Sequence, residues 1–228
     1  MLALALDTAT GDLVAGVGEV AVAESAASTD APGARLLAEM VESTRAHNER
    51  LVPACQKVLA EAGATFSDVD AIVVGCGPGP FTGLRVGMAT ASAFGQALGV
   101  PVYGVVTHDA VATQLGGGSV LVVTDARRRE VYWAHYVDGR RVAGPAVCAP
   151  GALPVSRVDV LSVPEHLAPQ VEVDAGARTY AAPRTLGLLA AADFGAPAGP
   201  LVPHYLRRPD AVEPKATPLS PAIPPVAR

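Results

Sequence analysis

Aromatic and charged side chains are both scarce in this sequence. Phe, Tyr and Trp make up 4% of the 228 residues, and Asp, Glu, Lys and Arg together make up 17%. The formal net charge of −5 argues against a protein that binds nucleic acid alone through a broad basic face. Half of the residues are hydrophobic, so the chain can bury a large core, which must consist mostly of Ala, Val and Leu.

Cysteine is also rare. Cys55, Cys76 and Cys148 are widely separated and form no C-x-x-C pair, so neither a zinc site nor a disulfide framework is indicated. Free thiols are typical of a reducing cytoplasm. No apolar run approaches the roughly 18 residues of a membrane span, and no basic region precedes the first apolar run. We therefore expect a cytoplasmic protein that has no signal peptide, does not span a membrane and does not bind one.

The most distinctive segment is the glycine-rich loop at residues 75–87. It does not match a P-loop, because Arg85 stands where the Ser or Thr of that motif would be. It does not match a dinucleotide fingerprint, because Thr82 replaces the third glycine. Pro78 and Pro80 also lack the N–H groups that would cradle a phosphate. We therefore interpret the loop as structural. Its predicted structural residues are Gly77, Gly79, Phe81, Thr82, Gly83 and Arg85.

Several segments carry a resemblance to a known family. Residues 77–85, GPGPFTGLR, resemble the GPGSFTGLR signature of the bacterial TsaB (YeaZ) family, with Pro80 in place of the usual Ser. Residues 124–132 resemble its DARR-x-EVY motif, and residues 201–207 its late P-x-YLR motif. Residues 6–10 resemble the first-strand motif of the wider actin, sugar-kinase and Hsp70 superfamily.

This resemblance covers about residues 1–210 and implies a fold. The expected fold is α/β, with two lobes and mixed sheets, of the actin-like, sugar-kinase and Hsp70 type (ASKHA, RNase H-like). We place an N-terminal RNase H-like lobe at residues 1–106 and a smaller second lobe at residues 107–208. The proline-rich residues 209–228 are expected to form a disordered tail.

Hydrophobic periodicity predicts most of the elements. Residues 36–43 fit either a helix or a strand by their pattern, and the resemblance makes them the third strand of a meander. Residues 149–185 show no clear periodicity. The other predicted strands are 1–6, 13–22, 71–75, 101–106, 120–124, 130–137 and 141–147, and the predicted helices are 48–62, 82–98 and 186–194.

Asp7, Thr8 and Thr10 follow the first strand and are a candidate vestigial nucleotide site. In superfamily members that use ATP, this position holds phosphate or a metal-bound water. Side chains of these types also cap turns by bonding to the backbone. Both interpretations stay open, and one alternative function is an independent nucleotide-binding, kinase-like enzyme.

The five histidines do not form an H-x-x-x-H or H-E-x-x-H pair, the spacings that place two metal ligands on one helix face. The family's catalytic paralogue, TsaD, carries such a pair just after the strand that follows the glycine loop. The two ligand positions fall on Thr107 and Val111 here, and Val111 cannot bind a metal. The resemblance therefore implies a chain with no metal, no cofactor and no catalytic residue.

The predicted helix 48–62 carries an apolar stripe that either covers the sheet or forms an interface. The resemblance implies that this helix and helix 82–98 pair with a sister subunit. The predicted interface residues are Leu51, Val52, Cys55, Val58, Leu59 and Ala62.

The resemblance also implies a function. The chain would be a non-catalytic subunit that binds and activates TsaD in the synthesis of N6-threonylcarbamoyladenosine on ANN-decoding tRNAs. TsaD would be its heterodimer partner, the TsaE ATPase a further partner, and tRNA would be engaged through the complex. The chain alone could form a homodimer, and a homodimeric structural protein without a tRNA role is the second alternative.

Overall fold

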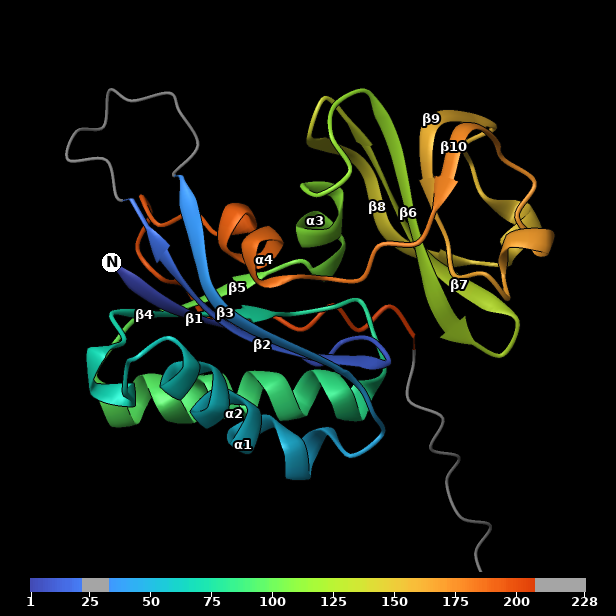
Figure 1. Cartoon of the computed structure of the whole chain (residues 1–228). Coiled ribbons are helices and arrows are strands. Elements are labelled where there is room, and N and C mark those ends of the chain that lie inside the picture. Colours follow the sequence, from blue (N-terminus) through green and yellow to red (C-terminus); the bar gives the residue numbers. More distant parts are fainter. Residues whose placement is uncertain (22–32, 208–228) are drawn as a thin grey trace, which may run out of the picture.

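The computed structural model describes residues 1–21 and 33–207 (Figure 1). These residues form two five-stranded sheets and four α-helices. In chain order, the elements are β1 (Leu2–Asp7), β2 (Asp12–Val20), β3 (Ala34–Ser43), α1 (His47–Glu61), β4 (Ala71–Gly75), α2 (Phe81–Leu98), β5 (Val102–Val105), α3 (Thr107–Ala112), β6 (Ser119–Arg127), β7 (Glu130–Val137), β8 (Arg140–Cys148), β9 (Arg157–Ser162), β10 (Asp174–Thr179) and α4 (Thr185–Ala191). Short 3₁₀ turns lie at Phe66–Asp68, Pro150–Ala152 and Ala168–Gln170.

The two sheets have the same strand order. The first is β3-β2-β1-β4-β5 and the second, read in the corresponding direction, is β8-β7-β6-β9-β10. In each sheet the first three strands form an antiparallel meander, and the last two add in parallel beside the first strand of that meander. The predicted two-lobed α/β fold with mixed sheets is therefore confirmed.

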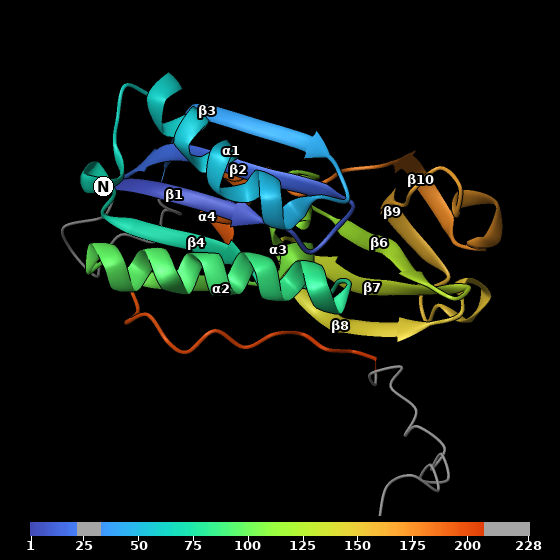
Figure 2. The same ribbon diagram turned by 90° about the horizontal axis from the view of Figure 1, so that it is seen from below.

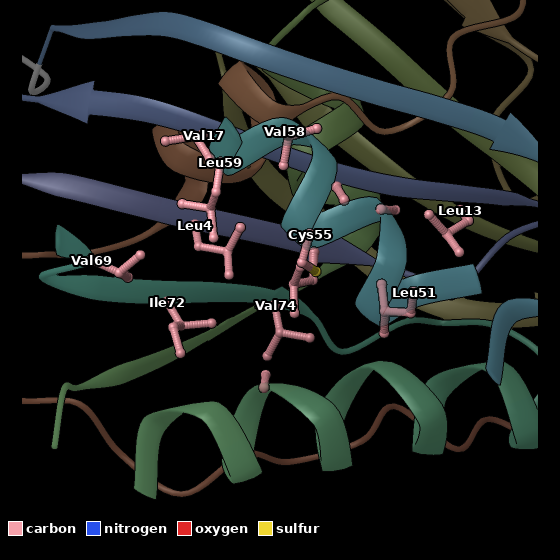
Figure 3. Close-up of a cluster of buried hydrophobic side chains, with 14 of the residues drawn as sticks. Leu4, Leu13, Val17, Leu51, Cys55, Val58, Leu59, Val69, Ile72 and Val74 are labelled. Atoms are coloured by element: carbon pink, nitrogen blue, oxygen red, sulfur yellow. The ribbon is translucent and has the colours of Figure 1, made fainter. Parts of the chain in front are cut away.

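The first sheet is covered on both faces. Helices α1 and α2 lie side by side on one face (Figure 2), and α4 lies on the other. The core beneath α1 joins Leu4, Leu13 and Val74 of the strands to Leu51 and Leu59 of the helix (Figure 3). On the opposite face, Leu188 and Leu189 of α4 join a second cluster with side chains of β1 and β2. The central strands β1 and β4 are buried on both faces, which explains their near-continuous apolar sequences.

The second sheet is covered differently. Irregular segments after β8 and β9 cover one of its faces, with Leu167, Val171 and Val173 packed against Val123 and Leu161 of the strands. The other face packs on α3, which connects the two sheets. The Asp109 carboxylate of α3 accepts a hydrogen bond from the Tyr136 hydroxyl at 2.7 Å and pairs with Arg141 at 3.0 Å. These bonds hold α3 against the second sheet.

After β10, the chain returns to the first sheet. Helix α4 contacts β1, β2 and β3, and Leu201 packs on the core beneath α2. The His204 N–H donates to the Cys76 carbonyl at 2.9 Å. We propose that the boundary between the lobes lies near residue 106. Helix α4 and residues 201–206 lie on the first sheet, although they follow the second sheet in sequence.

The structure tests the remaining predictions of elements. Residues 36–43 lie in a strand, as the resemblance implied, and the predicted helices correspond to α1, α2 and α4. Residues 149–185 contain β9 and β10, which the periodicity did not reveal. The predicted disordered tail at 209–228 lies outside the described residues. Among the helices in the described ranges, none combines the length and the hydropathy needed to span a membrane.

Candidate functional site

A cleft of about 1340 Å³ opens between the two lobes. The first lobe lines it with residues 8–12, 43–45, 47–49, 79–83 and Val86, which lie at or after the ends of β1, β3 and β4. The second lobe contributes residues 124–127 and side chains of three neighbouring segments, and residues 205–207 complete the wall. The cleft therefore lies where the glycine loop and the end of the first strand meet.

The glycine loop packs directly on the backbone that follows β1. A Cβ atom on Gly79 would overlap the carbonyl of Ala9, and one on Gly83 would overlap the carbonyl of Thr8. The Thr8 hydroxyl donates to the Gly83 carbonyl at 2.7 Å. Gly77 has a φ of +93°, which favours glycine. The loop therefore has small residues because two backbone segments approach closely here.

Asp7 is fully buried between this loop and α3. One carboxylate oxygen accepts the Ala9 N–H at 2.8 Å, and the other accepts the Thr107 hydroxyl at 2.7 Å. The Thr107 oxygen in turn accepts the Gly77 N–H at 3.2 Å. Burial raises the pKa of Asp7 from its ordinary 3.8 to about 6, although both hydrogen bonds act in the opposite direction.

These contacts bear on the candidate nucleotide site. Both Asp7 oxygens are engaged inside the protein, and the Thr8 hydroxyl faces Gly83. The Thr10 hydroxyl oxygen accepts the Asp12 N–H at 3.1 Å, which closes the turn between β1 and β2. Thr8 and Thr10 line the cleft, but Asp7 does not. The three predicted residues therefore lie together and have structural partners, as turn-capping side chains do.

The two positions that correspond to metal ligands do not fit a metal. Thr107 is buried and its hydroxyl is committed to Asp7, while Val111 lies in the apolar cluster between α3 and the second sheet. His108, between them, is buried with Nε2 at 2.9 Å from the Thr124 hydroxyl. Burial is the main cause that lowers its pKa to about 3, so the ring is neutral. Its Nδ1 has no partner among the described residues.

Comparison with known proteins assigns the family. The family model described as TsaD, tRNA N6-adenosine threonylcarbamoyltransferase, matches residues 36–194. A stretch of 96 residues is 38% identical to the TsaB protein of Escherichia coli and covers 40% of this chain and 42% of that protein. The structure of YeaZ from Pseudomonas aeruginosa covers 83% of this chain and 89% of that protein, at 27% identity and a TM-score of 0.66. The chain belongs to the TsaB (YeaZ) family.

A longer match links the chain to an uncharacterized protein of Mycobacterium tuberculosis (strain H37Rv). The two are 48% identical over 216 residues, covering 91% of this chain and 92% of that protein. This match covers residues of both lobes.

Two residues of the TsaB signature, Phe81 and Arg85, meet a third from the late motif. The Arg85 guanidinium lies 3.6 Å from the centre of the Phe81 ring, and its Nε donates to the Tyr205 hydroxyl at 3.1 Å. The rings of Phe81 and Tyr205 are 4.7 Å apart. Phe81, Thr82 and Arg85 are exposed, and Phe81 and Thr82 line the cleft.

The apolar stripe of α1 proves to be core. Leu51, Cys55, Val58 and Leu59 are at most 2% exposed and point into the first sheet (Figure 3). The physical reason is that the sheet face is wide enough to bury the whole stripe, so these four side chains cannot contact a partner. Val52 is 39% exposed, and Ala62 is partly buried. An interface formed by α1 has to use its outer face.

The outer faces of α1 and α2 lie beside each other on the surface. On α2, Ala89, Ala93 and Ala97 are exposed and recur every fourth residue, which places them on one stripe. On α1, Val52 and Pro53 are exposed. Sequence reasoning missed the alanine stripe because alanine suits both a core and a surface, and only the sheet shows which side of α2 is buried.

Sequence reasoning also missed the partners of Asp7 and Arg85. Thr107 lies 100 residues from Asp7 in the chain, and Tyr205 lies 120 residues from Arg85. The motif at 201–207 could have drawn attention to Tyr205, because it resembles a motif of the family. It did not indicate that this segment packs beside the glycine loop.

Proposed function

We propose that this chain is the non-catalytic subunit that binds and activates TsaD in the biosynthesis of N6-threonylcarbamoyladenosine on ANN-decoding tRNAs. It would act in the cytoplasm. The family assignment supports a role in this biosynthesis. The observation that carries the non-catalytic part is that Thr107 and Val111 occupy the two ligand positions, with Thr107 bonded to Asp7.

A subunit of this kind acts through its surface. It stabilises the active arrangement of its partner by binding that arrangement more tightly than the inactive one. The exposed faces of α1 and α2 are the proposed contact. Their alanine stripe lets another helix approach closely, and Val52 offers apolar surface at its edge.

The same face would serve the other proposed assemblies. A homodimer of the isolated chain would place two copies of the α1 and α2 layer against each other around a twofold axis. TsaD would replace the second copy in the heterodimer. TsaE and tRNA would then join through the complex, with TsaE as the associated ATPase.

The test is a substitution on the exposed stripe. Ala93→Arg adds a long charged side chain at the centre of the proposed contact, and we expect association with TsaD to weaken by at least about a hundredfold, equivalent to about 3 kcal/mol. Circular dichroism should show a native fold. The matched control is Val142→Arg, because Val142 is 57% exposed on the second sheet, far from α2 in sequence. Wild-type affinity of the Ala93→Arg chain for TsaD, measured by sedimentation, would exclude this surface.

Two other functions have their own tests. A kinase-like enzyme requires stoichiometric binding of ATP by the purified chain, and the engagement of both Asp7 oxygens inside the protein disfavours it. A homodimeric structural protein requires self-association without TsaD. Recovery of TsaD with this chain from a cell extract would exclude the second of these alternatives.

A further inference from the structure

Residues 201–207, here called the strap, contact both lobes. The first part of the strap lies on the first lobe, where Leu201 packs on the core beneath α2 and the His204 N–H donates to a carbonyl just after β4 at 2.9 Å. The Tyr205 ring lies 4.7 Å from the ring of Phe81, the first residue of α2. The strap is therefore attached to the first lobe by its backbone, by an apolar side chain and by an aromatic ring.

The last residue of the strap lies on the second lobe. The Arg207 guanidinium donates to the Ala126 carbonyl at 2.7 Å and pairs with the Glu130 carboxylate at 3.1 Å. Ala126 belongs to β6 and Glu130 is the first residue of β7, so one side chain binds both strands of this hairpin. The side chains of Arg207 and Glu130 are only 25% and 37% exposed, which limits the screening of their attraction by salt. Arg207 thus attaches the strap to the second lobe.

The lobes are also joined away from the cleft, through α3 and α4, which lie between the two sheets (Figure 1). The Gln114 side chain donates to the Ala182 carbonyl at 3.2 Å, and a Cβ atom on Gly187 would overlap the Ala110 carbonyl. These four residues are not part of the cleft lining, whereas the end of the strap is. The two lobes are therefore attached at two separate places, one at the cleft and one away from it.

We propose that the strap is an interlobe clasp, which fixes the orientation of the two lobes by binding both of them at the cleft. Two bodies joined along one line can rotate about it as a hinge, and closure of a cleft between domains is such a rotation. The junction of α3 and α4 supplies that line. The strap is a second attachment away from it, so it prevents the rotation as long as Arg207 stays bound.

The clasp sets the width of the cleft. Phe81 and Tyr205 line the cleft at the first lobe, and Tyr180, which follows β10, lines it from the second. The three rings are 40%, 40% and 47% exposed. With the lobes fixed, the spacing of these rings is set before any occupant arrives, and an occupant of matching size binds without the cost of rearranging the lobes. This inference goes beyond the proposed function and does not depend on it.

The experiment measures the distance between the lobes in the full-length chain by pulsed electron spin resonance. Glu49 and Glu165 are exposed and line the cleft from different lobes, so Glu49→Cys and Glu165→Cys carry the spin labels. Cys148→Ser is included in every labelled chain, while the thiols of Cys55 and Cys76 are buried. We expect one narrow distribution of distances, because the clasp holds the lobes in one arrangement.

The decisive variant is Arg207→Met, which removes the guanidinium and keeps an unbranched side chain. We expect the mean distance to increase by more than about 2 Å and the distribution to broaden. Glu130→Gln removes only the charge of the carboxylate and leaves the bond from Arg207 to the Ala126 carbonyl. It should broaden the distribution by less.

The matched control is Arg178→Met. The Arg178 guanidinium also donates to two backbone carbonyls, at 2.7 Å and 3.4 Å, but both belong to the second lobe. This variant loses the same atoms without changing the strap, so it should keep the distribution of the parent chain. Circular dichroism of each variant establishes that it is folded.

Three outcomes would overturn the proposal. A broad distribution in the parent chain would mean that the lobes are not fixed. An unchanged distribution in the folded Arg207→Met chain would mean that the strap does not fix them. Equal broadening in the Arg178→Met chain would mean that the effect is not specific to the strap. If the Arg207→Met chain does not fold, Glu130→Gln tests the same attachment, and an unchanged distribution in that chain would also reject the clasp.

Discussion

The two lobes have the same strand order and different crossovers. In the first lobe, the chain passes from β3 to β4 through the 15-residue α1 and from β4 to β5 through the 18-residue α2. In the second lobe, three-residue 3₁₀ turns at 150–152 and 168–170 stand at the same two places. One topology is therefore built once with helices and once almost without them.

This difference shows what the helices add. The second sheet buries its face beneath irregular segments through Leu167, Val171 and Val173, so a helix layer is not required to complete the core. In the first lobe, α1 and α2 bury one side and present another to solvent. The helical lobe thereby gains an ordered outer surface, and the proposed partner contact lies on it.

The largest expected effect breaks the helix layer of the first lobe. Leu59→Glu places an unpaired charge in the core beneath α1, at a side chain only 2% exposed. We expect a loss of about 3–5 kcal/mol, enough to unfold a marginally stable domain. Circular dichroism and urea unfolding measure it. The control Gln56→Glu, on the exposed side of α1, should leave stability within about 0.5 kcal/mol. A folded Leu59→Glu chain would mean that α1 is not part of the core.

The second prediction compares two strand-end carboxylates, the buried Asp7 and the 44% exposed Asp125. The pKa of Asp7 in the folded chain is raised from 3.8 to about 6. Protonation of Asp7 therefore favours the folded state. This contribution to stability is full below pH 3.8 and is lost as the pH rises through about 6. Asp7→Asn lacks this loss.

The stability of the Asp7→Asn chain relative to the wild type should therefore increase by about 2 kcal/mol between pH 4 and pH 7. Urea unfolding across this range measures the difference. Asp125→Asn controls for the removal of one charge at an exposed strand end. A difference that stays constant with pH would show that Asp7 is not desolvated as the structure indicates.

The third prediction concerns the glycine loop, which leads from β4 into α2. At the corresponding place in the second lobe, β9 is not followed by an α-helix. Gly79→Ala places a Cβ against the Ala9 carbonyl, and we expect a loss of about 1–3 kcal/mol. Gly11→Ala is the matched control, since its Cβ meets nothing within 4 Å. Thermal unfolding compares the two. Equal melting temperatures together with lost function would instead indicate a ligand site at the loop.

The smallest expected effect compares the two cores directly. Leu59→Ala and Leu167→Ala remove the same atoms from two buried side chains. Leu59 lies on a helix, and Leu167 lies on an irregular segment. The irregular segment can collapse further into the cavity, so we expect Leu167→Ala to cost about 1 kcal/mol less. Urea unfolding of both variants measures the difference. A larger loss for Leu167→Ala would show that the second lobe is the more rigid one.

The sequence predicted much of the fold, and its failures have a common cause. The stripe of α1 and the apolar runs of β1 and β4 are strong local patterns, so their elements were found. Strands β9 and β10 were missed for two reasons. Each strand has only six residues and lies in a proline-rich region, and β10 is exposed for most of its length. Such strands are held by pairing with neighbours, and that pairing is not a local property.

By itself, the sequence determined which segments are amphipathic, that no histidine pair is spaced for a metal, and that the glycine loop cannot cradle phosphate through its prolines. Only the tertiary structure decided that the α1 stripe faces the sheet, that Asp7 is bonded to Thr107, and that the exposed rings share one cleft. The physical reason is that burial and hydrogen bonding depend on segments far apart in the chain, such as Asp7 and Thr107, 100 residues apart. Local propensity cannot encode their meeting, which is fixed when the strands pair and the helices pack.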